Sequence, residues 1–423
     1  MYWINGGKSM LRRLRVCGFK SLQDVTMELP RMAVLFGPNA TGKSNLLDAI
    51  QALSRIGTQR TLADALDSPI RGYPIEAFSF PEGGLSELLS QPSASFVLEA
   101  DLAVGSNDYR YRTTVQIEPT SGQLSIQDEY VAQISAKTGN PKYTAAIEKV
   151  GDNLHIRRKS KPARPREERV GLNHSLVSDP RFSGREYNAI ERVRKELEDW
   201  RTYYLDPRVA MRVARPPADV FDIGVLGENI APFLFKLRAK EPKCFDAISR
   251  TLRQIIPSVQ RLDIDLDKDR GTLDLVVRQG GIDYSSRIIS EGTLRVLALC
   301  AIAVNPWGGD LIAFEEPENG VHPRRLELIA KLLLSMSATQ ERPRQLVVTT
   351  HSPLFCDALL KENGVGREGV GLFNVRREGE STIVSPFDVT GPLFTDSEIA
   401  AALASRTEDG RFEGLVLRGL IDE

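Results

Sequence analysis

Cysteine and histidine are scarce in this sequence, which holds only four of each. The cysteines are scattered and form no C-x-x-C pair, which argues against a disulfide scaffold and against a cysteine-based zinc site. No apolar run approaches the roughly 18 residues that a transmembrane helix needs. The first eight residues also lack the apolar core of a signal peptide. We therefore expect a soluble, cytoplasmic protein that has no membrane partner.

The sequence also lacks an excess of charge of either sign, because 55 Lys and Arg residues oppose 56 Asp and Glu residues. This balance excludes a uniformly basic nucleic-acid-binding surface but leaves room for local basic clusters. DNA binding through two such clusters competes with the simpler interpretation of solvated basic loops. The clusters consist of Lys8, Arg12, Arg13, Arg15 and Lys20 in the first, and of Arg157, Arg158, Lys159, Lys161, Arg164, Arg166 and Arg169 in the second.

The distribution of apolar residues predicts an α/β protein. The apolar run 32–36 precedes a glycine-rich loop, and apolar residues at helical spacing follow it, which indicates a strand, a loop and a helix. Residues 96–160 alternate apolar and polar side chains between turn signals, as expected for antiparallel hairpins. From residue 290 onward, helices alternate with apolar strands at 311–314 and 346–349, which predicts a parallel sheet flanked by helices.

These patterns divide the chain into four predicted parts. They are an N-terminal part of the core over 1–95, an antiparallel β subdomain over 96–160, an exposed basic loop and helical insertion over 161–285, and a C-terminal part of the core over 286–423. The helical segments expected near and within the insertion are 186–201, 226–240 and 242–256, whereas 157–185 has the composition of an exposed loop.

One motif carries specific chemistry. It is Gly37-x-x-x-x-Gly42-Lys43-Ser44, which matches the pattern of a phosphate-binding loop. The glycines of such a loop let backbone N–H groups wrap a phosphate, and the N-terminus of the following helix adds positive character. The lysine reaches the β- and γ-phosphates, and the serine hydroxyl binds Mg²⁺. The candidate phosphate-binding residues are Gly37, Pro38, Asn39, Ala40, Thr41, Gly42, Lys43, Ser44 and Asn45.

Three further segments place polar residues where a nucleotide site needs them. The strand 311–314 ends in Glu315 and Glu316, and in P-loop ATPases the first such acid holds Mg²⁺ through water while the second polarises the attacking water. His351 follows the strand 346–349, where ligands of parallel sheets bind, and a histidine there can hydrogen-bond a γ-phosphate. Ser290 is a candidate helix cap, and Gly292 leaves the backbone open at the helix start. The simpler alternatives are an acidic loop, a structural histidine and an ordinary helix start.

Taken in order, the motifs resemble those of ATP-binding cassette (ABC) ATPases, and most closely the RecF/OLD/SMC-like branch of that class. The resemblance covers about 11–120 and 200–385. The similar segments are the N-terminal strand signature Leu14–Leu22, Walker A at 37–50, the signature motif Ser290–Arg295, Walker B with its D-loop at Glu315–Pro323, and the switch-histidine segment at 349–353.

This resemblance implies an α/β, P-loop ABC-type ATPase core with a mixed or parallel sheet, and it implies ATP and Mg²⁺ as cofactors. Catalytic roles would fall on Lys43, Glu316 and His351, and metal binding on Ser44 and Glu315. The resemblance also implies a two-fold symmetric homodimer, in which the signature residues Ser290 and Gly292 of one copy contact the γ-phosphate held by Lys43 of the other. Such an enzyme acts as a nucleotide-dependent switch or clamp.

Two departures from the family pattern concern the site. Glu315 stands where the family usually has aspartate, so its carboxylate lies one methylene further from the backbone. No glutamine occurs in 203–207, where we expect the Q-loop, so that contact is unassigned. A scaffold that binds ATP without hydrolysing it is therefore an alternative function.

The inserted and appended segments narrow the subfamily. We expect no SMC-type coiled-coil arms, because only about 186–201 has the pattern of an exposed helix. We also expect no Toprim nuclease domain of the OLD type in the 72 residues after His351. By family analogy we expect action with a separate nuclease or toxin-like effector, in DNA repair or anti-phage defence. The ATPase subunit of a transporter is a further alternative, although the sequence has no LSGGQ-like signature.

Overall fold

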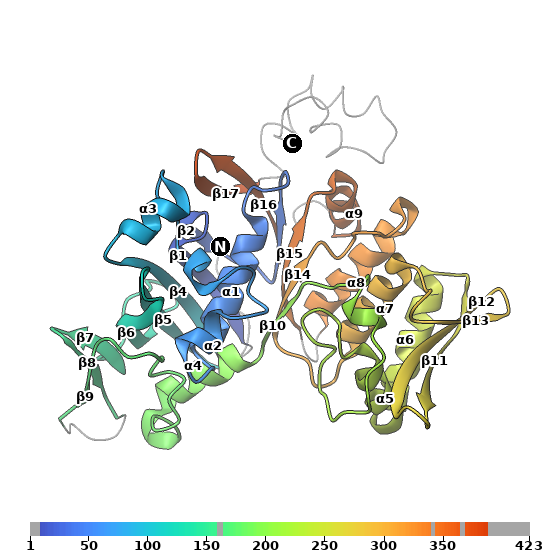
Figure 1. Ribbon diagram of the computed structural model, residues 1–423, viewed down its shortest axis with the longest axis horizontal. Helices are drawn as coiled ribbons and strands as arrows, with labels where there is room; N and C mark the ends of the chain where they lie inside the picture. Colours follow the sequence, from blue (N-terminus) through green and yellow to red (C-terminus); the bar gives the residue numbers. More distant parts are fainter. Residues whose placement is uncertain (1–8, 159–163, 340–342, 364–368, 388–423) are drawn as a thin grey trace. The chain divides into compact units, whose positions relative to one another are not determined.

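The computed structural model describes residues 9–158, 164–339, 343–363 and 369–387, which form two compact units (Figure 1). Unit 1 takes its described residues from 1–31, 38–200 and 373–386, and unit 2 takes its own from 32–37, 201–372 and 387–423. Three lysines of the predicted basic clusters, Lys8, Lys159 and Lys161, lie outside the described residues. No helix within the described ranges is both long enough and apolar enough to cross a lipid bilayer.

Unit 1 is built on an eight-stranded sheet in which every neighbouring pair of strands is antiparallel. The order across the sheet is β2-β1-β4-β5-β6-β7-β8-β9. The hairpins expected over 96–160 are confirmed, but the segment 157–185, expected to be a loop, contributes the edge strand β9. The strands are β1 Met10–Phe19, β2 Leu22–Glu28, β4 Ala94–Val104, β5 Asn107–Glu118, β6 Gln123–Ile134, β7 Ile147–Val150, β8 Asn153–Ile156 and β9 Arg166–Arg169.

The two faces of this sheet follow from the alternation of side chains along its strands. In β4, Phe96 and Leu98 are buried in the core, whereas Glu99 points to the opposite face and pairs with Arg13 of β1 at 2.6 Å. The buried face packs against α4 (Asn188–Glu198), which in turn contacts α1 (Lys43–Ile56). Helix α1 buries Leu46, Leu47, Ile50 and Leu53, as their helical spacing predicts. The short helices of unit 1 are α2 Leu62–Leu66 and α3 Gly84–Ser90.

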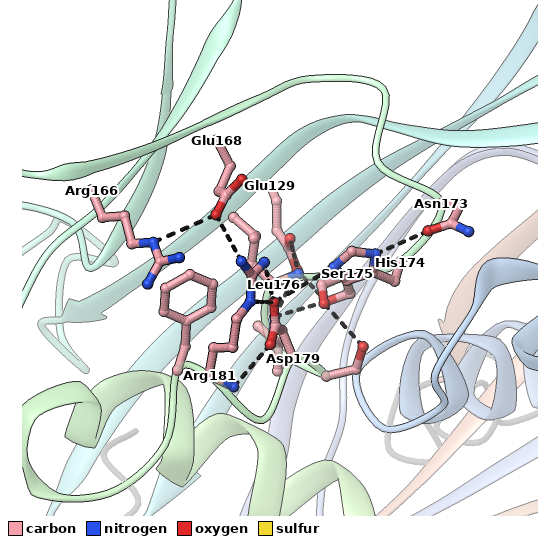
Figure 2. A network of polar contacts seen from close by, with 12 residues as sticks. Glu129, Arg166, Glu168, Asn173, His174, Ser175, Leu176, Asp179 and Arg181 are labelled. Atoms are coloured by element: carbon pink, nitrogen blue, oxygen red, sulfur yellow. Dashed lines mark hydrogen bonds and ion pairs between the residues drawn. The ribbon is translucent and has the colours of Figure 1, made fainter.

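A buried polar network holds the loop between β9 and α4 onto the sheet (Figure 2). Glu129 of β6 is fully buried, and its carboxylate accepts the Leu176 N–H at 2.7 Å and the Ser175 hydroxyl. Arg181 bridges Asp179 at 2.6 Å and Glu168 of β9 at 3.2 Å. Burial raises the pKa of Glu129, against the hydrogen bonds that lower it. Because the Ser175 hydroxyl and the Leu176 N–H both donate to this buried carboxylate, the contacts fix the loop on β6.

Unit 2 contains the parallel sheet that the sequence predicts. Strands β10 (Trp200–Tyr203), β14 (Leu311–Glu315), β15 (Gln345–Thr350) and β3 (Met32–Phe36) lie in this order, and β14, β15 and β3 run parallel. All three of these parallel strands match predicted apolar runs. The helices of unit 2 are α5 Ile230–Lys240, α6 Pro242–Ile255, α7 Glu291–Val304, α8 Leu326–Ala338 and α9 Pro353–Asn363.

The insertion that we expected to be helical also contains a small antiparallel sheet. Its strands are β11 (Val259–Asp267), β12 (Thr272–Gln279) and β13 (Ile282–Ser285). Six apolar side chains of β11 and β12 are buried in the same core cluster as α5 and α6: Val259, Leu262, Ile264, Leu273, Leu275 and Val277. The last strands described are β16 (Val370–Glu378) and β17 (Ser381–Phe387), and residues 373–386 of this hairpin belong to unit 1.

Candidate functional site

The phosphate loop follows β3 and leads directly into α1, as the sequence predicts. Gly42 and Ala40 have positive φ values of 98° and 66°, which curl the loop. The Thr41 hydroxyl donates to the Pro38 carbonyl at 3.0 Å, and the Lys43 ammonium donates to the same carbonyl. Lys43 is only 5% exposed, so its charge lies folded into the loop. A buried cation beside the N–H groups of the first turn of α1 makes this loop suitable for an anionic phosphate.

Side chains of the turn between β1 and β2 contact the first turns of α1. The Lys20 ammonium lies 2.6 Å from the carboxylate of Asp48, which is fully buried in α1. Arg71 reaches the same carboxylate at 3.0 Å. The Asn45 amide donates to the Ser21 hydroxyl at 2.8 Å. The segment Leu14–Leu22, which the sequence analysis singled out only as a family signature, therefore contacts the helix that follows the phosphate loop.

The carboxyl ends of three parallel strands meet at one edge of the sheet in unit 2. In the register, Glu315 of β14 lies opposite Thr349 of β15, and Thr350 lies opposite Phe36 of β3. The acids after β14, the histidine after β15 and Gly37 after β3 therefore leave the sheet on the same side. This edge is where ligands of parallel α/β sheets bind. The predicted location of His351 at a strand end is confirmed.

Glu316 and His351 form a direct pair at this edge. The Nδ1 atom of His351 lies 2.8 Å from Oε1 of Glu316, and the Asn319 amide reaches Oε2 of Glu316 at 3.5 Å. Glu316 adopts a φ of 44°, a conformation that non-glycine residues rarely hold, and its N–H donates to the Thr349 carbonyl at 3.1 Å. The backbone thus turns sharply to aim this carboxylate at the histidine.

The sequence analysis gave no individual role to two residues beside this pair. Glu318 is 5% exposed and accepts the hydroxyl of Thr350, the last residue of β15. Burial raises the pKa of Glu318 to about 7. Arg295 of α7 is also buried, and it donates to the carbonyls of Glu316 at 3.3 Å and Leu205 at 3.4 Å. Burial lowers the pKa of Arg295, although the surrounding glutamates act in the opposite direction. The only sequence signal for a role of either residue is that Glu318 lies in the Walker B segment and Arg295 in the signature segment.

The signature segment begins α7 as predicted. The Ser290 side chain caps the helix by accepting the Thr293 N–H at 3.2 Å. Gly292 has a steric reason to be glycine, because a Cβ there would lie 2.3 Å from the Gly320 carbonyl oxygen. The neighbouring residue Glu291 forms an ion pair with Arg208, with 3.1 Å between the guanidinium and the carboxylate. The contact of Ser290 and Gly292 with a nucleotide held by a second copy stays a prediction.

The expected metal ligands, Ser44 and Glu315, lie in different units. Among the described residues, no group of three or more His, Cys, Asp or Glu side chains could by itself hold a metal ion. A serine hydroxyl and a carboxylate are oxygen ligands of the kind that Mg²⁺ takes from proteins, and Mg²⁺ completes its coordination with water and substrate phosphates.

The predicted basic clusters are largely neutralised within unit 1. Arg13 pairs with Glu99, Arg157 with Glu148 at 2.6 Å, and Arg158 with Glu186 at 3.3 Å. Ion pairs also engage Arg12, Arg15, Lys20 and Arg166. Counting charges along the chain therefore overstates the positive potential of both segments.

Comparison with known families agrees with this geometry. Residues 32–357 match the family described as "AAA domain, putative AbiEii toxin, Type IV TA system". The chain belongs to this AAA-domain family. The match runs from β3 through Walker A and the signature to the switch histidine, so the prediction of a P-loop ATPase domain is confirmed. The α/β fold class is confirmed as well. No curated protein matches the chain.

Solved structures with a similar fold include SMC heads and a RecF protein. An SMC head bound to the C-terminal winged-helix domain of ScpA is 14% identical, with 90% of this chain and 98% of that chain covered and a TM-score of 0.49. The SMC head with an extended coiled coil from Pyrococcus furiosus is 12% identical, with coverages of 90% and 97% and a TM-score of 0.48. The recombination mediator RecF is 14% identical, with coverages of 90% and 99% and a TM-score of 0.43.

Proposed function

We propose that the protein binds Mg²⁺–ATP at its phosphate loop and hydrolyses it, and that the nucleotide switches a homodimer between closed and open states. The observation that carries this proposal is the pair of Glu316 and His351 at the sheet edge from which the phosphate loop departs at Gly37. Membership of the AAA-domain family supports the ATPase class.

Glu316 is the proposed general base for the attacking water. Its carboxylate is held by His351 on one oxygen and by Asn319 on the other, which restricts its orientation. When the imidazole is protonated, both ring nitrogens donate: Nδ1 to Glu316 and Nε2 to a phosphate oxygen. The pair can therefore orient a water molecule while it contacts the group that the water attacks.

Lys43 and Ser44 are the proposed phosphate and metal ligands of the loop. Lys43 donates to the Pro38 carbonyl, and we expect it to exchange this neutral acceptor for the β- and γ-phosphates. Ser44 and Glu315 would hold Mg²⁺, which neutralises the charge that develops on the transferred phosphoryl group.

The dimer proposal rests on the surface around the signature segment. Arg212 donates to the carbonyls of Arg287 and Ile289, each at 2.7 Å, and so joins the segment 207–213 to the start of α7. Both joined segments expose apolar side chains: Val209 is 65% exposed and Ile288 is 67% exposed. Exposed apolar groups beside Ser290 are what a face that closes on a second copy needs.

The family description bears on the effector and the pathway. The family description names a toxin and a type IV toxin–antitoxin system, which favours anti-phage defence with a separate protein effector over DNA repair. Duplex DNA is a weaker candidate partner, because many arginines of the basic clusters are ion-paired. Fluorescence anisotropy with duplex DNA at two salt concentrations tests it: affinity that is absent or insensitive to salt removes DNA from the proposal.

Steady-state phosphate release tests the enzymatic proposal. We expect release that requires Mg²⁺, loss of nucleotide binding in Lys43→Ala, and a kcat about 100- to 1,000-fold lower in Glu316→Gln with nucleotide binding retained. Glu327→Gln is the matched control, because Glu327 is a half-exposed acid on α8 that pairs only with Lys361 among the described residues. If the wild-type protein binds ATP but releases no phosphate, the scaffold alternative replaces the enzyme.

A further inference from the structure

A threonine near the end of the described chain contacts the phosphate loop. Thr382 lies on β17, 341 residues after Thr41, yet its hydroxyl donates to the Thr41 carbonyl at 2.8 Å. Its backbone N–H donates to the Ser21 carbonyl at 2.9 Å, which fixes the strand against the turn between β1 and β2. Thr382 is only 1% exposed. The backbone hydrogen bond of Thr382 thus fixes the position of its hydroxyl, and burial shields this hydroxyl from water.

The hydroxyl of Ser21 extends this contact into a chain of hydrogen bonds. Its Oγ lies 2.7 Å from Oγ1 of Thr382, and it accepts the Asn45 amide at 2.8 Å. Each hydroxyl has one proton to donate. Because Thr382 gives its proton to the Thr41 carbonyl, the proton between the two hydroxyls must come from Ser21. The direction is therefore from Asn45 to Ser21, then to Thr382, and then to the backbone of the loop.

Gly42 shows how closely this relay packs on the loop. A Cβ at Gly42 would lie 2.1 Å from Oγ1 of Thr382 and 2.7 Å from Oγ of Ser21, and the residue has a φ of 98°. The two hydroxyls therefore occupy the space that a side chain would need. The glycine immediately before Lys43 is required here by the relay as well as by the curvature of the loop.

We propose that Thr382 and Ser21 are positioning residues that hold the phosphate loop in its binding conformation before a nucleoside triphosphate arrives. The relay joins the last part of the loop to the helix, because it starts at Asn45 in the first turn of α1 and ends at the Thr41 carbonyl. When the loop already has its bound curvature, binding carries a smaller entropic cost of ordering the loop, and the net affinity is higher. This inference rests on the proposed nucleotide-binding function and assigns a part of that site to the β16–β17 hairpin.

The test measures binding of a fluorescent ATP analogue with Mg²⁺ to the full chain. Thr382→Val keeps the shape but removes the donor, and we expect an affinity about 5- to 30-fold lower, as for the loss of a buried hydrogen bond. Thr382→Ser keeps the donor and is expected to bind within about twofold of wild type. In steady state, Thr382→Val should raise KM for ATP and leave kcat at saturation unchanged.

Ser54→Ala is the matched control, because the Ser54 hydroxyl donates to the Leu197 carbonyl at 2.7 Å near the other end of α1. It should leave nucleotide affinity unchanged. If Thr382→Val does not fold, Ser21→Ala removes the preceding step of the relay, and a smaller loss of affinity is expected.

Wild-type affinity in Thr382→Val, or in Ser21→Ala where that variant stands in, overturns the inference and leaves the proposed function intact. An equal loss in Thr382→Ser and Thr382→Val also overturns it, because the donor would then be irrelevant. If the wild-type chain binds no nucleotide, the proposed function fails and the inference falls with it.

Discussion

Glu318 leads to a sharp stability prediction, because a buried acid destabilises the fold when it is ionised. Its side chain is 5% exposed, one carboxylate oxygen accepts the Thr350 hydroxyl, and the other has no hydrogen-bond partner among the described residues. Burial is the main cause that raises its pKa to about 7. The charge of Glu316 adds to the rise, whereas the Thr350 hydrogen bond and His351 oppose it.

The sign of the pH dependence follows from comparing the folded and unfolded carboxyl. Between about pH 4.5 and pH 7, the unfolded group is ionised while the folded group keeps its proton. The folded state therefore binds more protons, and the free energy of unfolding falls as the pH rises. A rise in pKa from 4.5 to about 7 corresponds to a loss of about 3 kcal/mol in the free energy of unfolding. This loss is complete once the pH exceeds the folded pKa of Glu318.

Glu318→Gln should remove this contribution, because glutamine is never charged and can still accept the Thr350 hydroxyl. We expect the variant to be about 2–3 kcal/mol more stable than wild type at pH 8 and nearly equal to it at pH 5. Urea-induced unfolding followed by circular dichroism at both pH values measures the difference. The exposed Glu327→Gln should change stability by less than about 0.5 kcal/mol at either pH. Parallel pH profiles for wild type and Glu318→Gln would refute the reasoning.

Two further predictions concern the contacts that hold the site. Asp48→Asn should destabilise the protein by about 3–5 kcal/mol, because it leaves the Lys20 ammonium, whose side chain is only 12% exposed, without its buried charged partner. Arg71→Ala, which removes the more exposed partner, should cost about 1 kcal/mol or less in the same urea titration, and equal losses would contradict this order. Arg295→Met should lower kcat about 10- to 100-fold while nucleotide affinity stays within about twofold, because the guanidinium holds the carbonyl of the general base. A normal kcat in phosphate-release assays would remove Arg295 from the site.

The parts of the fold that could be predicted from the sequence are those with a local signal. Strands β3, β14 and β15 are continuous apolar runs because both faces of a parallel sheet are buried. The phosphate loop is recognised by the spacing of its two glycines and by the Lys43-Ser44 pair that follows them. The sheet β11–β13 was missed because the apolar residues of β11 lie among the acids of 263–269, which obscure the alternation typical of a strand. The edge strand β9 was missed for a related reason, since four charged residues make it, Arg166–Arg169.

The parts of the site that sequence reasoning missed depend on partners far apart in the chain. Thr382 acts on a loop 341 residues away, and no spacing rule connects the two. Arg13 counted as part of a basic cluster, although its partner Glu99 lies on the neighbouring strand, 86 residues later. Glu318 and Arg295 lie within recognised motifs, but only burial shows that they contact the residues expected to act on the nucleotide. Chain-local patterns therefore identify the motif residues, and tertiary contacts identify what holds them.

The central claim is that ATP closes a dimer and that hydrolysis at Glu316 opens it. Sedimentation velocity of Glu316→Gln, with and without Mg²⁺–ATP, tests this claim most directly, with Lys43→Ala as the variant that should not respond. We expect Glu316→Gln to shift from monomer to dimer when ATP is added and to return to monomer when the nucleotide is removed. A sedimentation profile that ATP does not change, in a variant shown to bind the nucleotide, would contradict the claim.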